Sequence, residues 1–133
     1  MSLTGLSDEE VRNNLPSFFM HELGDVISVH GLLSLVTKFG GENLYIPHTA
    51  SPDGKLAGLL SPNDYEALCA RCGGNVLKVP MAAKLKKLKR DKEIVAMKKA
   101  GASHLSIAKK FGIRDRSVYR ILREMERNGY SIS

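Results

Sequence analysis

The chain has 133 residues, with 20 Lys or Arg, 14 Asp or Glu and a formal net charge of +6. Its length allows one medium-sized domain or two small ones, and its aromatic content of 6% excludes a large core in either half. Two cysteines exclude a secreted disulfide framework, and no apolar run approaches the ~18 residues of a membrane span.

The N-terminus carries an acidic run, SDEE at 7–10, where a secretory leader would be basic and then apolar. We therefore expect a cytoplasmic protein without a membrane segment. Because neither half can bury much apolar surface alone, dimerisation is an expected source of stability.

Charge divides the chain into two parts. Residues 84–133 hold 15 Lys or Arg against 5 Asp or Glu, a net charge of +10, whereas residues 1–83 hold 5 against 9, a net charge of −4. This contrast predicts an association domain over 1–83 and a polyanion-binding domain over 84–133. The run KLKKLKR at 84–90 by itself is typical of a solvated helix face, and only its neighbourhood makes it a candidate phosphate contact.

Two short helices are predicted first. Ser7 and Glu10 form a capping-box pattern that opens a helix ending before Pro16. Pro16 suits the first turn of the second helix. That helix is expected to carry Phe18, Phe19, Leu23, Val26 and Ile27.

The next region contains two similar segments joined by a loop over 48–60. In the first, apolar residues at helical spacing over 31–39 precede Gly40-Gly41 and the short strand ENLYIP. In the second, Ser61 caps a helix whose Asp64 is expected to reach back toward the cap, and NVLKVP follows Gly73-Gly74. The predicted fold class is thus mainly α with short β-strands (α+β).

These segments, at about 31–47 and 62–80, form an internal repeat with a constant offset of 33 residues. Each copy reads helix, glycine pair, strand and proline, and is too small to bury its apolar face alone. The copies can pack on each other, on a second chain, or on both. We hypothesise that the strands at 43–46 and 76–79 pair within one chain and give a pseudo-twofold domain.

Cys69-x-x-Cys72 raises the question of a metal or thiol-redox site. A single CxxC is half of a four-ligand site, and no second Cys or His pair has a zinc spacing. In the repeat Cys69 aligns with Val36 and Cys72 with Phe39, so we interpret both as small core residues. The four histidines, His21, His30, His48 and His104, are scattered, and no catalytic arrangement is present. The sequence predicts no metal, no cofactor and no enzyme.

Residues 104–123 have the pattern of a helix-turn-helix. A helix over 84–99 precedes it, closed by Gly101, and Ser103 caps the first helix of the pair. Ala108 allows the two helices to cross closely, and Gly112 suits a left-handed turn. The small core is expected from Ile107, Phe111, Ile113, Val118 and Ile121.

This pattern leaves a basic and hydrogen-bonding face exposed. The candidate DNA-binding residues are Lys109, Lys110, Arg114, Arg116, Ser117, Tyr119, Arg120 and Arg123. Arg116 and Arg120 are expected to read guanine, whereas the two lysines, Arg114 and Arg123 suit phosphate. Ser117 and Tyr119 can bond phosphate or a base edge. Alternatively, Tyr119 packs on the neighbouring helix and only the arginines touch DNA.

Taken together, GDVISVHGLLSLVTKFGGENLYIP and KKAGASHLSIAKKFGIRDRSVYRIL resemble the Mor family of phage-type transcription activators. Members join a helix–Gly-Gly–strand dimerisation region, whose strand reads close to YIP, to a C-terminal helix-turn-helix. FGGENLYIP matches that motif closely and CGGNVLKVP more loosely. Lys78 stands in the tyrosine position of the motif, and Arg114 in a position that is usually Ser or Thr.

The resemblance implies a homodimer that binds an imperfect inverted repeat of double-stranded DNA and recruits RNA polymerase. It also implies a hinge at Gly73-Gly74 and groove contacts from the strands, here Asn43, Tyr45 and Lys78. A competing reading is a DNA-architectural or protein-interaction factor that uses the helix-turn-helix only for docking. Activation rather than repression follows from the resemblance alone.

Overall fold

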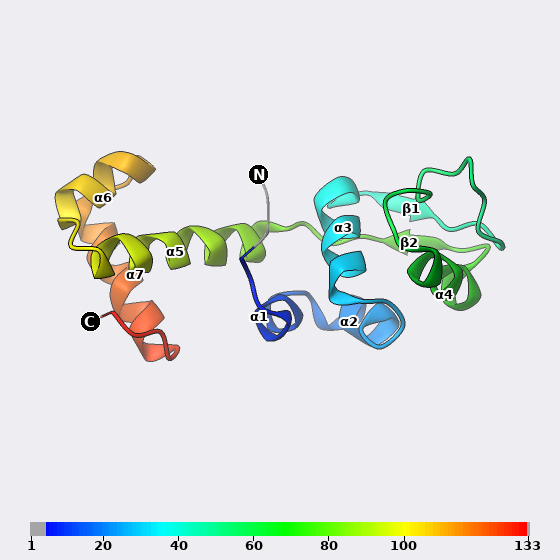
Figure 1. Cartoon of the computed structure of the whole chain (residues 1–133), viewed down its shortest axis with the longest axis horizontal. Coiled ribbons are helices and arrows are strands. Elements are labelled where there is room, and N and C mark those ends of the chain that lie inside the picture. The colour runs from blue at the N-terminus through cyan, green and yellow to red at the C-terminus, as the bar shows by residue number, and fades with distance from the viewer. Residues whose placement is uncertain (1–4, 133) are drawn as a thin grey trace. The chain divides into compact units, whose positions relative to one another are not determined.

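The computed structural model describes residues 5–132, which fall into two units divided between Leu85 and Lys86 (Figure 1). Within this range the chain forms seven helices and one two-stranded antiparallel sheet. The expected class, mainly α with short strands, is confirmed. None of the helices in the described range combines the length and apolar character needed to cross a membrane.

The first unit begins with two short helices, α1 (Asp8–Asn13) and α2 (Ser17–Leu23). The capping box is present: the Glu10 N–H donates to Ser7 Oγ at 3.1 Å, and the Ser7 N–H donates to Glu10 Oε1 at 2.8 Å. Pro16 lies at the cap of α2, one residue before the helix proper.

Helix α2 is shorter than predicted. It ends at Leu23, so Val26 and Ile27 lie beyond it, in a turn where the Val26 N–H donates to the Leu23 carbonyl at 3.0 Å. The turn still buries Ile27, which is 4% exposed. An apolar residue four positions after Leu23 fits a helix and this turn equally well, which is why the spacing misplaced the helix end.

The two repeat copies have the same secondary structure at the same positions. In the first, Ser28 caps α3 (Val29–Phe39), which leads to β1 (Asn43–Tyr45); in the second, Ser61 caps α4 (Pro62–Cys72), which leads to β2 (Val76–Lys78). Every one of these bounds differs by 33 residues between the copies. The repeat therefore extends back to the capping serines.

Each glycine pair makes the same tight turn. Gly40 and Gly73 have φ near −53° and ψ near 130° (−52°/128° and −54°/133°), while Gly41 and Gly74 have φ of +84° and +82°. These angles are those of a type II turn, whose third residue is normally glycine because a Cβ disfavours positive φ. The sequence needs the second glycine of each pair for this reason.

Strands β1 and β2 pair antiparallel within the one chain, with Leu44 opposite Leu77 at the centre. The hydrogen bonds that flank the strands are equivalent in the two copies. The Gly41 N–H donates to the Val79 carbonyl at 2.9 Å, and the Gly74 N–H donates to the Ile46 carbonyl at 2.7 Å. The hypothesis of an internal pseudo-twofold is confirmed at the level of strand pairing.

The symmetry is broken at one buried carboxylate. Asp64 was expected to reach back to the start of its own helix, and this prediction is wrong. Its backbone N–H donates to Ser61 Oγ at 3.2 Å, but its carboxylate crosses to the other copy and accepts from the N–H and the hydroxyl of Ser28, at 3.0 and 2.5 Å. The equivalent position in the first copy is Gly31, where a Cβ would lie 2.7 Å from Asp64 Oδ2. A side chain of one copy therefore caps the helix of the other.

Both cysteines lie in the core of the first unit. Cys69 is 6% and Cys72 is 3% exposed. The residues aligned with them in the first copy, Val36 and Phe39, are buried as well. The Cys72 thiol donates to Glu22 Oε1 at 3.5 Å; burial, this hydrogen bond and the carboxylate charge raise its pKa to about 11, against an opposing effect of Arg71. A thiol held protonated is a poor nucleophile and a poor metal ligand. In the described range no three His, Cys, Asp or Glu residues come together as a metal site.

The second unit contains most of α5 (Ala83–Lys99) together with α6 (His104–Phe111) and α7 (Asp115–Arg127). Its core consists of Ile94, Val95, Ile107, Ala108, Val118, Ile121, Leu122 and Met125. Two predicted core residues, Phe111 and Ile113, are only partly buried at its margin. They flank the turn, where the chain leaves one helix and has not yet entered the next.

The turn between α6 and α7 has the expected conformation. Gly112 has φ +65° and ψ 33°, and the N–H groups of Gly112 and Ile113 both satisfy the Ala108 carbonyl at the end of α6. Ser103 caps the other end of α6, because its hydroxyl accepts from the Ser106 N–H at 3.1 Å. Two short helices with defined ends are thus held at a tight corner.

Candidate nucleic-acid interface

Helix α7 has two distinct sides. Val118, Ile121, Leu122 and Met125 are buried against α5 and α6 residues of the same core. The other side carries five exposed residues at helical spacing: Arg116, Tyr119, Arg120, Arg123 and Arg127. Because an α-helix repeats every 3.6 residues, steps of three and four place these side chains along one stripe.

The stripe lines a shallow hollow on the surface. Its walls are Asp115, Arg116, Tyr119, Arg120, Arg123 and Arg127. Four of these residues are arginines and one is an aspartate. Arg127 was not among the residues predicted from sequence, although its position four residues after Arg123 on the same helix face was a sufficient signal.

A second hollow adjoins the first at the corner between α6 and α7. It is lined by Leu105, Ala108, Lys109, Gly112, Ile113, Arg114, Asp115 and Arg116. Lys109 and Arg114 therefore lie near the foot of the α7 stripe. Asp115 and Arg116 border both hollows, which makes the surface continuous from α6 to the end of α7.

Two further predicted residues lie outside these hollows. Lys110 is exposed, and its ammonium is 5.7 Å from the centre of the Phe111 ring. Ser117 is half-buried on α7, and its N–H donates to the Arg114 carbonyl at 3.0 Å. All eight predicted residues are on α6, α7 or the turn, but only six border the concave surface.

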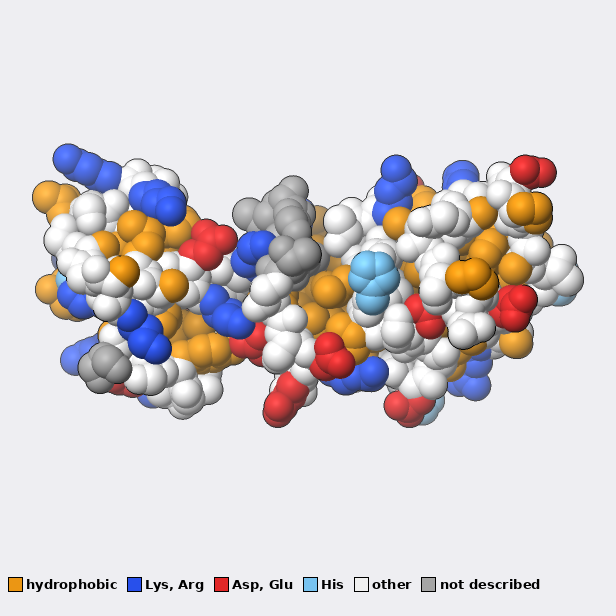
Figure 2. All heavy atoms as spheres, in the orientation of Figure 1, with side chains coloured by type: hydrophobic (Ala, Val, Ile, Leu, Met, Phe, Trp, Pro, Cys, Tyr) orange, Lys and Arg blue, Asp and Glu red, His pale blue; other side chains and the backbone are white. Residues whose placement is uncertain are grey.

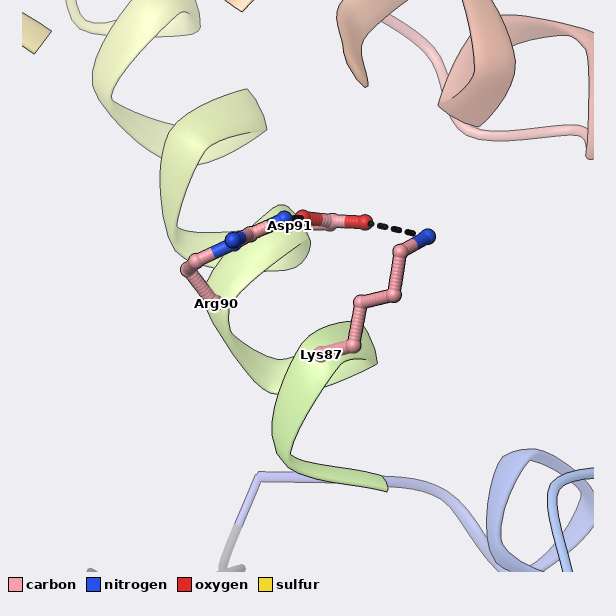
Figure 3. A network of polar contacts seen from close by, with 3 residues as sticks. All are labelled: Lys87, Arg90 and Asp91. Atoms are coloured by element: carbon pink, nitrogen blue, oxygen red, sulfur yellow. Dashed lines mark hydrogen bonds and ion pairs between the residues drawn. The ribbon is translucent and has the colours of Figure 1, made fainter. Parts of the chain in front are cut away.

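Among the described residues, none forms an ion pair with an arginine of the stripe. Elsewhere in the second unit, Lys87 and Arg90 form ion pairs with Asp91, with N–O distances of 3.4 and 2.9 Å (Figure 3). The Asp91 side chain is 5% exposed. A buried carboxylate without a partner would be costly, so these two cations serve the fold of α5. The arginines of α7 remain available to an external anion, and Figure 2 shows Lys and Arg side chains spread over the part of the surface that carries α5 to α7.

Tyr119 packs on the neighbouring helix, and its contact there is His104, a partner that the sequence did not identify. Its ring stacks on that of His104, with centroids 4.0 Å apart and an angle of 15° between the planes. His104 is the first residue of α6 and Tyr119 is in the middle of α7, so the stack bridges the two helices. Tyr119 is nevertheless 57% exposed. The tyrosine both packs on the neighbouring helix and faces solvent, which combines the two alternatives considered from sequence.

In the first unit the predicted strand residues share one face of the sheet. Asn43, Tyr45 and Lys78 are all exposed, as is Val76, while Leu44 and Leu77 point to the core. Asn43 lies opposite Lys78 in the register and Tyr45 opposite Val76. The pseudo-twofold thus places unlike residues at equivalent positions: asparagine and valine at one, tyrosine and lysine at the other.

The predicted hinge, Gly73-Gly74, is a hydrogen-bonded turn in this structure. The Gly73 N–H donates to the Cys69 carbonyl at 2.8 Å, and the His48 ring lies where a Cβ on Gly74 would be. A side chain at Gly74 would displace the imidazole. Movement at this turn stays a prediction.

Comparison with known proteins gives one match. A family model described as the Mor transcription activator family matches residues 51–131. The matched range contains the second repeat copy, α5, and the two hollows on α6 and α7, whereas the first copy precedes it. No curated protein and no solved structure matches the chain. Because the match covers more than half of the 133 residues and includes the whole basic surface, the chain belongs to the Mor transcription activator family.

Proposed function

We propose that the protein is a sequence-specific DNA-binding transcription activator in which α6 and α7 act as a helix-turn-helix. In this arrangement α7 is the recognition helix and enters the major groove. The observation that carries the proposal is the stripe of four exposed, unneutralised arginines on α7, on a helix whose other side is anchored in a core. The protein binds its partner and performs no catalysis.

The position of each side chain supports a division of roles. Arg116 and Arg120 lie in the N-terminal half of the stripe and are proposed to read guanine bidentately, each contributing about 1–3 kcal/mol of base discrimination. Lys109 and Arg114 at the corner, and Arg123 further along, are proposed to bind phosphate. The exposed Lys110 is a further proposed phosphate contact. Arg127 is another, one helical turn beyond Arg123.

The strand face is the second proposed DNA contact, with Asn43, Tyr45 and Lys78 entering a groove as the family resemblance implies. The internal strand pairing changes what this means for assembly. A chain that pairs its own strands does not need a second chain to complete the sheet, so a homodimer on an inverted repeat would have to use another surface. We retain the homodimer, the recruitment of RNA polymerase and a cytoplasmic location as parts of the proposal.

Selection of bound DNA from a random pool tests the proposal. The expected result is a defined enriched sequence, bound with a specific affinity ~10³-fold or more above that for unrelated duplex at the same salt concentration. An inverted repeat among the enriched sequences, with a protein mass of two chains by light scattering, would support the homodimer. A single asymmetric site bound by one chain would refute the homodimer and keep the DNA-binding function.

The competing function, a DNA-architectural or docking factor, predicts a different result. Such a protein would bind unrelated duplexes with nearly equal affinity, and its binding would weaken steeply with salt because phosphate contacts dominate. No enriched sequence would then emerge. The observation that favours the specific function is that arginines and a tyrosine, which can hydrogen-bond to base edges, occupy the exposed side of α7.

A further inference from the structure

His104 contacts Tyr119, the aromatic residue of the basic stripe, and can fix the orientation of its ring. It begins α6, and its position is fixed by the Ser103 cap, whose hydroxyl accepts from Ser106 and whose carbonyl accepts from the Ser106 hydroxyl at 3.0 Å. The imidazole lies flat on the Tyr119 ring at 4.0 Å.

Tyr119 would be mobile without this contact. Its ring is more than half exposed, and a helical tyrosine on a free surface exchanges between two common χ1 rotamers. An aromatic stack of typical strength favours one orientation by about 2- to 12-fold. The stack therefore selects the rotamer in which Tyr119 lines the hollow formed with Arg116, Arg120, Arg123 and Arg127. This hollow is called the arginine hollow below.

We propose that His104 is a positioning residue for sequence recognition: by stacking on Tyr119, it holds the phenol in the arginine hollow before DNA arrives. The inference rests on the proposed function. Arg116 lies three residues before Tyr119 and Arg123 four residues after it on the same helix face, so a fixed ring also limits the directions in which these two side chains can extend. A base pair that contacts this part of the stripe then meets hydrogen-bonding groups that are already oriented. Less side-chain conformational freedom is therefore lost on binding.

The role differs from that of the charged residues around it. Phosphate binding by lysine and arginine depends on charge and tolerates side-chain motion, whereas base readout depends on orientation. Removing the stack should therefore weaken binding to the selected site and leave binding to unrelated duplex nearly unchanged. A histidine acting only as an extra positive charge would affect both equally.

The experiment uses the full chain with the duplex enriched from a random pool and an unrelated duplex of equal length, at one fixed pH and salt concentration. Affinities are measured for wild type, His104→Ala, His104→Phe, Tyr119→Ala and the double alanine variant. His30→Ala, an exposed histidine of the first unit, is the matched control. Thermal unfolding is recorded for every variant, and the chemical shifts of the Tyr119 ring protons for each variant that retains Tyr119.

We expect His104→Ala to weaken binding to the enriched duplex by about 2- to 12-fold and binding to the unrelated duplex by less than about twofold. His104→Phe should restore the affinity, since phenylalanine keeps the flat ring. In the double-alanine cycle the losses should be non-additive, because either single change removes the stack. The Tyr119 ring protons should move downfield in His104→Ala, where the shielding imidazole is lost.

Four outcomes would overturn the inference, three of them in the binding data and one in the chemical shifts. Additive losses in the cycle, equal losses on both duplexes, or a His104→Phe variant as weak as His104→Ala would each show that stacking does not position Tyr119 for readout. Unchanged Tyr119 shifts in His104→Ala would show that the rings do not stack in solution. A wild type that enriches no sequence would refute the proposed function itself, and the inference with it; an enriched site with additive losses refutes the inference alone.

Discussion

The carboxylate that joins the two repeat copies leads to a quantitative prediction. Asp64 accepts two hydrogen bonds from Ser28, and hydrogen bonds to a charged group contribute ~1.5–3 kcal/mol each. Ser28 is exposed, so water can replace part of the loss when the carboxylate is removed. We therefore expect Asp64→Ala to destabilise the first unit by about 2 kcal/mol, below the sum of two full bonds. The exposed Glu66→Ala, on the same helix, should have little effect.

Gly31 makes the test sharper. A Cβ at this position would lie 2.7 Å from Asp64 Oδ2, so Gly31→Ala should destabilise the wild type. Once Asp64→Ala has removed the carboxylate, the nearest remaining neighbour of that Cβ is Ile27 Cδ1 at 3.3 Å. There the same change should be nearly neutral or should stabilise by up to ~1 kcal/mol through helix propensity. The sign of the Gly31→Ala effect thus depends on Asp64.

Urea titration followed by hydrogen exchange and mass spectrometry suits this measurement, because it reads peptides of each unit separately in the full chain. The free energy of unfolding is compared for wild type, the two single variants and the double variant, with unchanged m-values as the criterion for the same transition. If Asp64→Ala were no more destabilising than Glu66→Ala, or if the effects of the two changes were additive, the cross-repeat cap would not exist in solution.

Three further predictions concern the corner, the recognition surface and a buried thiol. Gly112→Ala should destabilise the second unit by about 1–2 kcal/mol for backbone reasons alone, since nothing lies within 4 Å of the new Cβ, and Gly112→Asn by less, as thermal unfolding can show. Arg120→Ala should weaken binding to the selected DNA about 5- to 150-fold and binding to unrelated DNA far less, with the exposed Arg71→Ala as control; equal losses in a gel-shift titration would contradict base readout. Because the folded pKa of Cys72 is raised above the ordinary value of 9.0 to about 11, its stabilising effect should be complete below pH 9 and lost as pH rises toward 11. Glu22→Gln should lower the folded pKa of Cys72 and so narrow the pH range over which this stability is lost, as measured by unfolding at a series of pH values. An unchanged pH range would show that the Glu22 carboxylate does not hold the thiol proton.

The internal strand pairing bears on how this family member assembles. The hydrogen bonds that close the sheet are duplicated at both ends by residues 33 apart in sequence, so the two copies satisfy each other's backbone groups. The exposed side chains of β1 and β2 differ, however, because Lys78 stands at the repeat position equivalent to Tyr45. A DNA groove that contacts this face of the sheet would therefore contact unlike side chains on a backbone with twofold symmetry.

The amino-acid sequence alone was sufficient for the local features. Ser61 and Ser103 predicted helix starts, Gly112 predicted the corner, and the glycine pairs predicted the ends of the two helices before them, because each depends on the conformational preference or hydrogen bonding of residues within one turn of chain. The exposed stripe of α7 was predictable for a similar reason, since helical periodicity assigns a side to every residue once the helix is placed. Even there Arg127 was overlooked.

Other features depended on residues distant in sequence, and only the tertiary structure decided them. The repeat allowed its copies to pack on each other, on a second chain, or on both, and the pairing of Leu44 with Leu77 shows that the strands of one chain pair with each other. Asp64 had a partner nearby in sequence and bonded instead to Ser28, 36 residues away, and His104 met Tyr119 only because the corner folds α6 onto α7. Such contacts follow from chain closure and packing, in which many weak interactions compete, so no local pattern of residues encodes them.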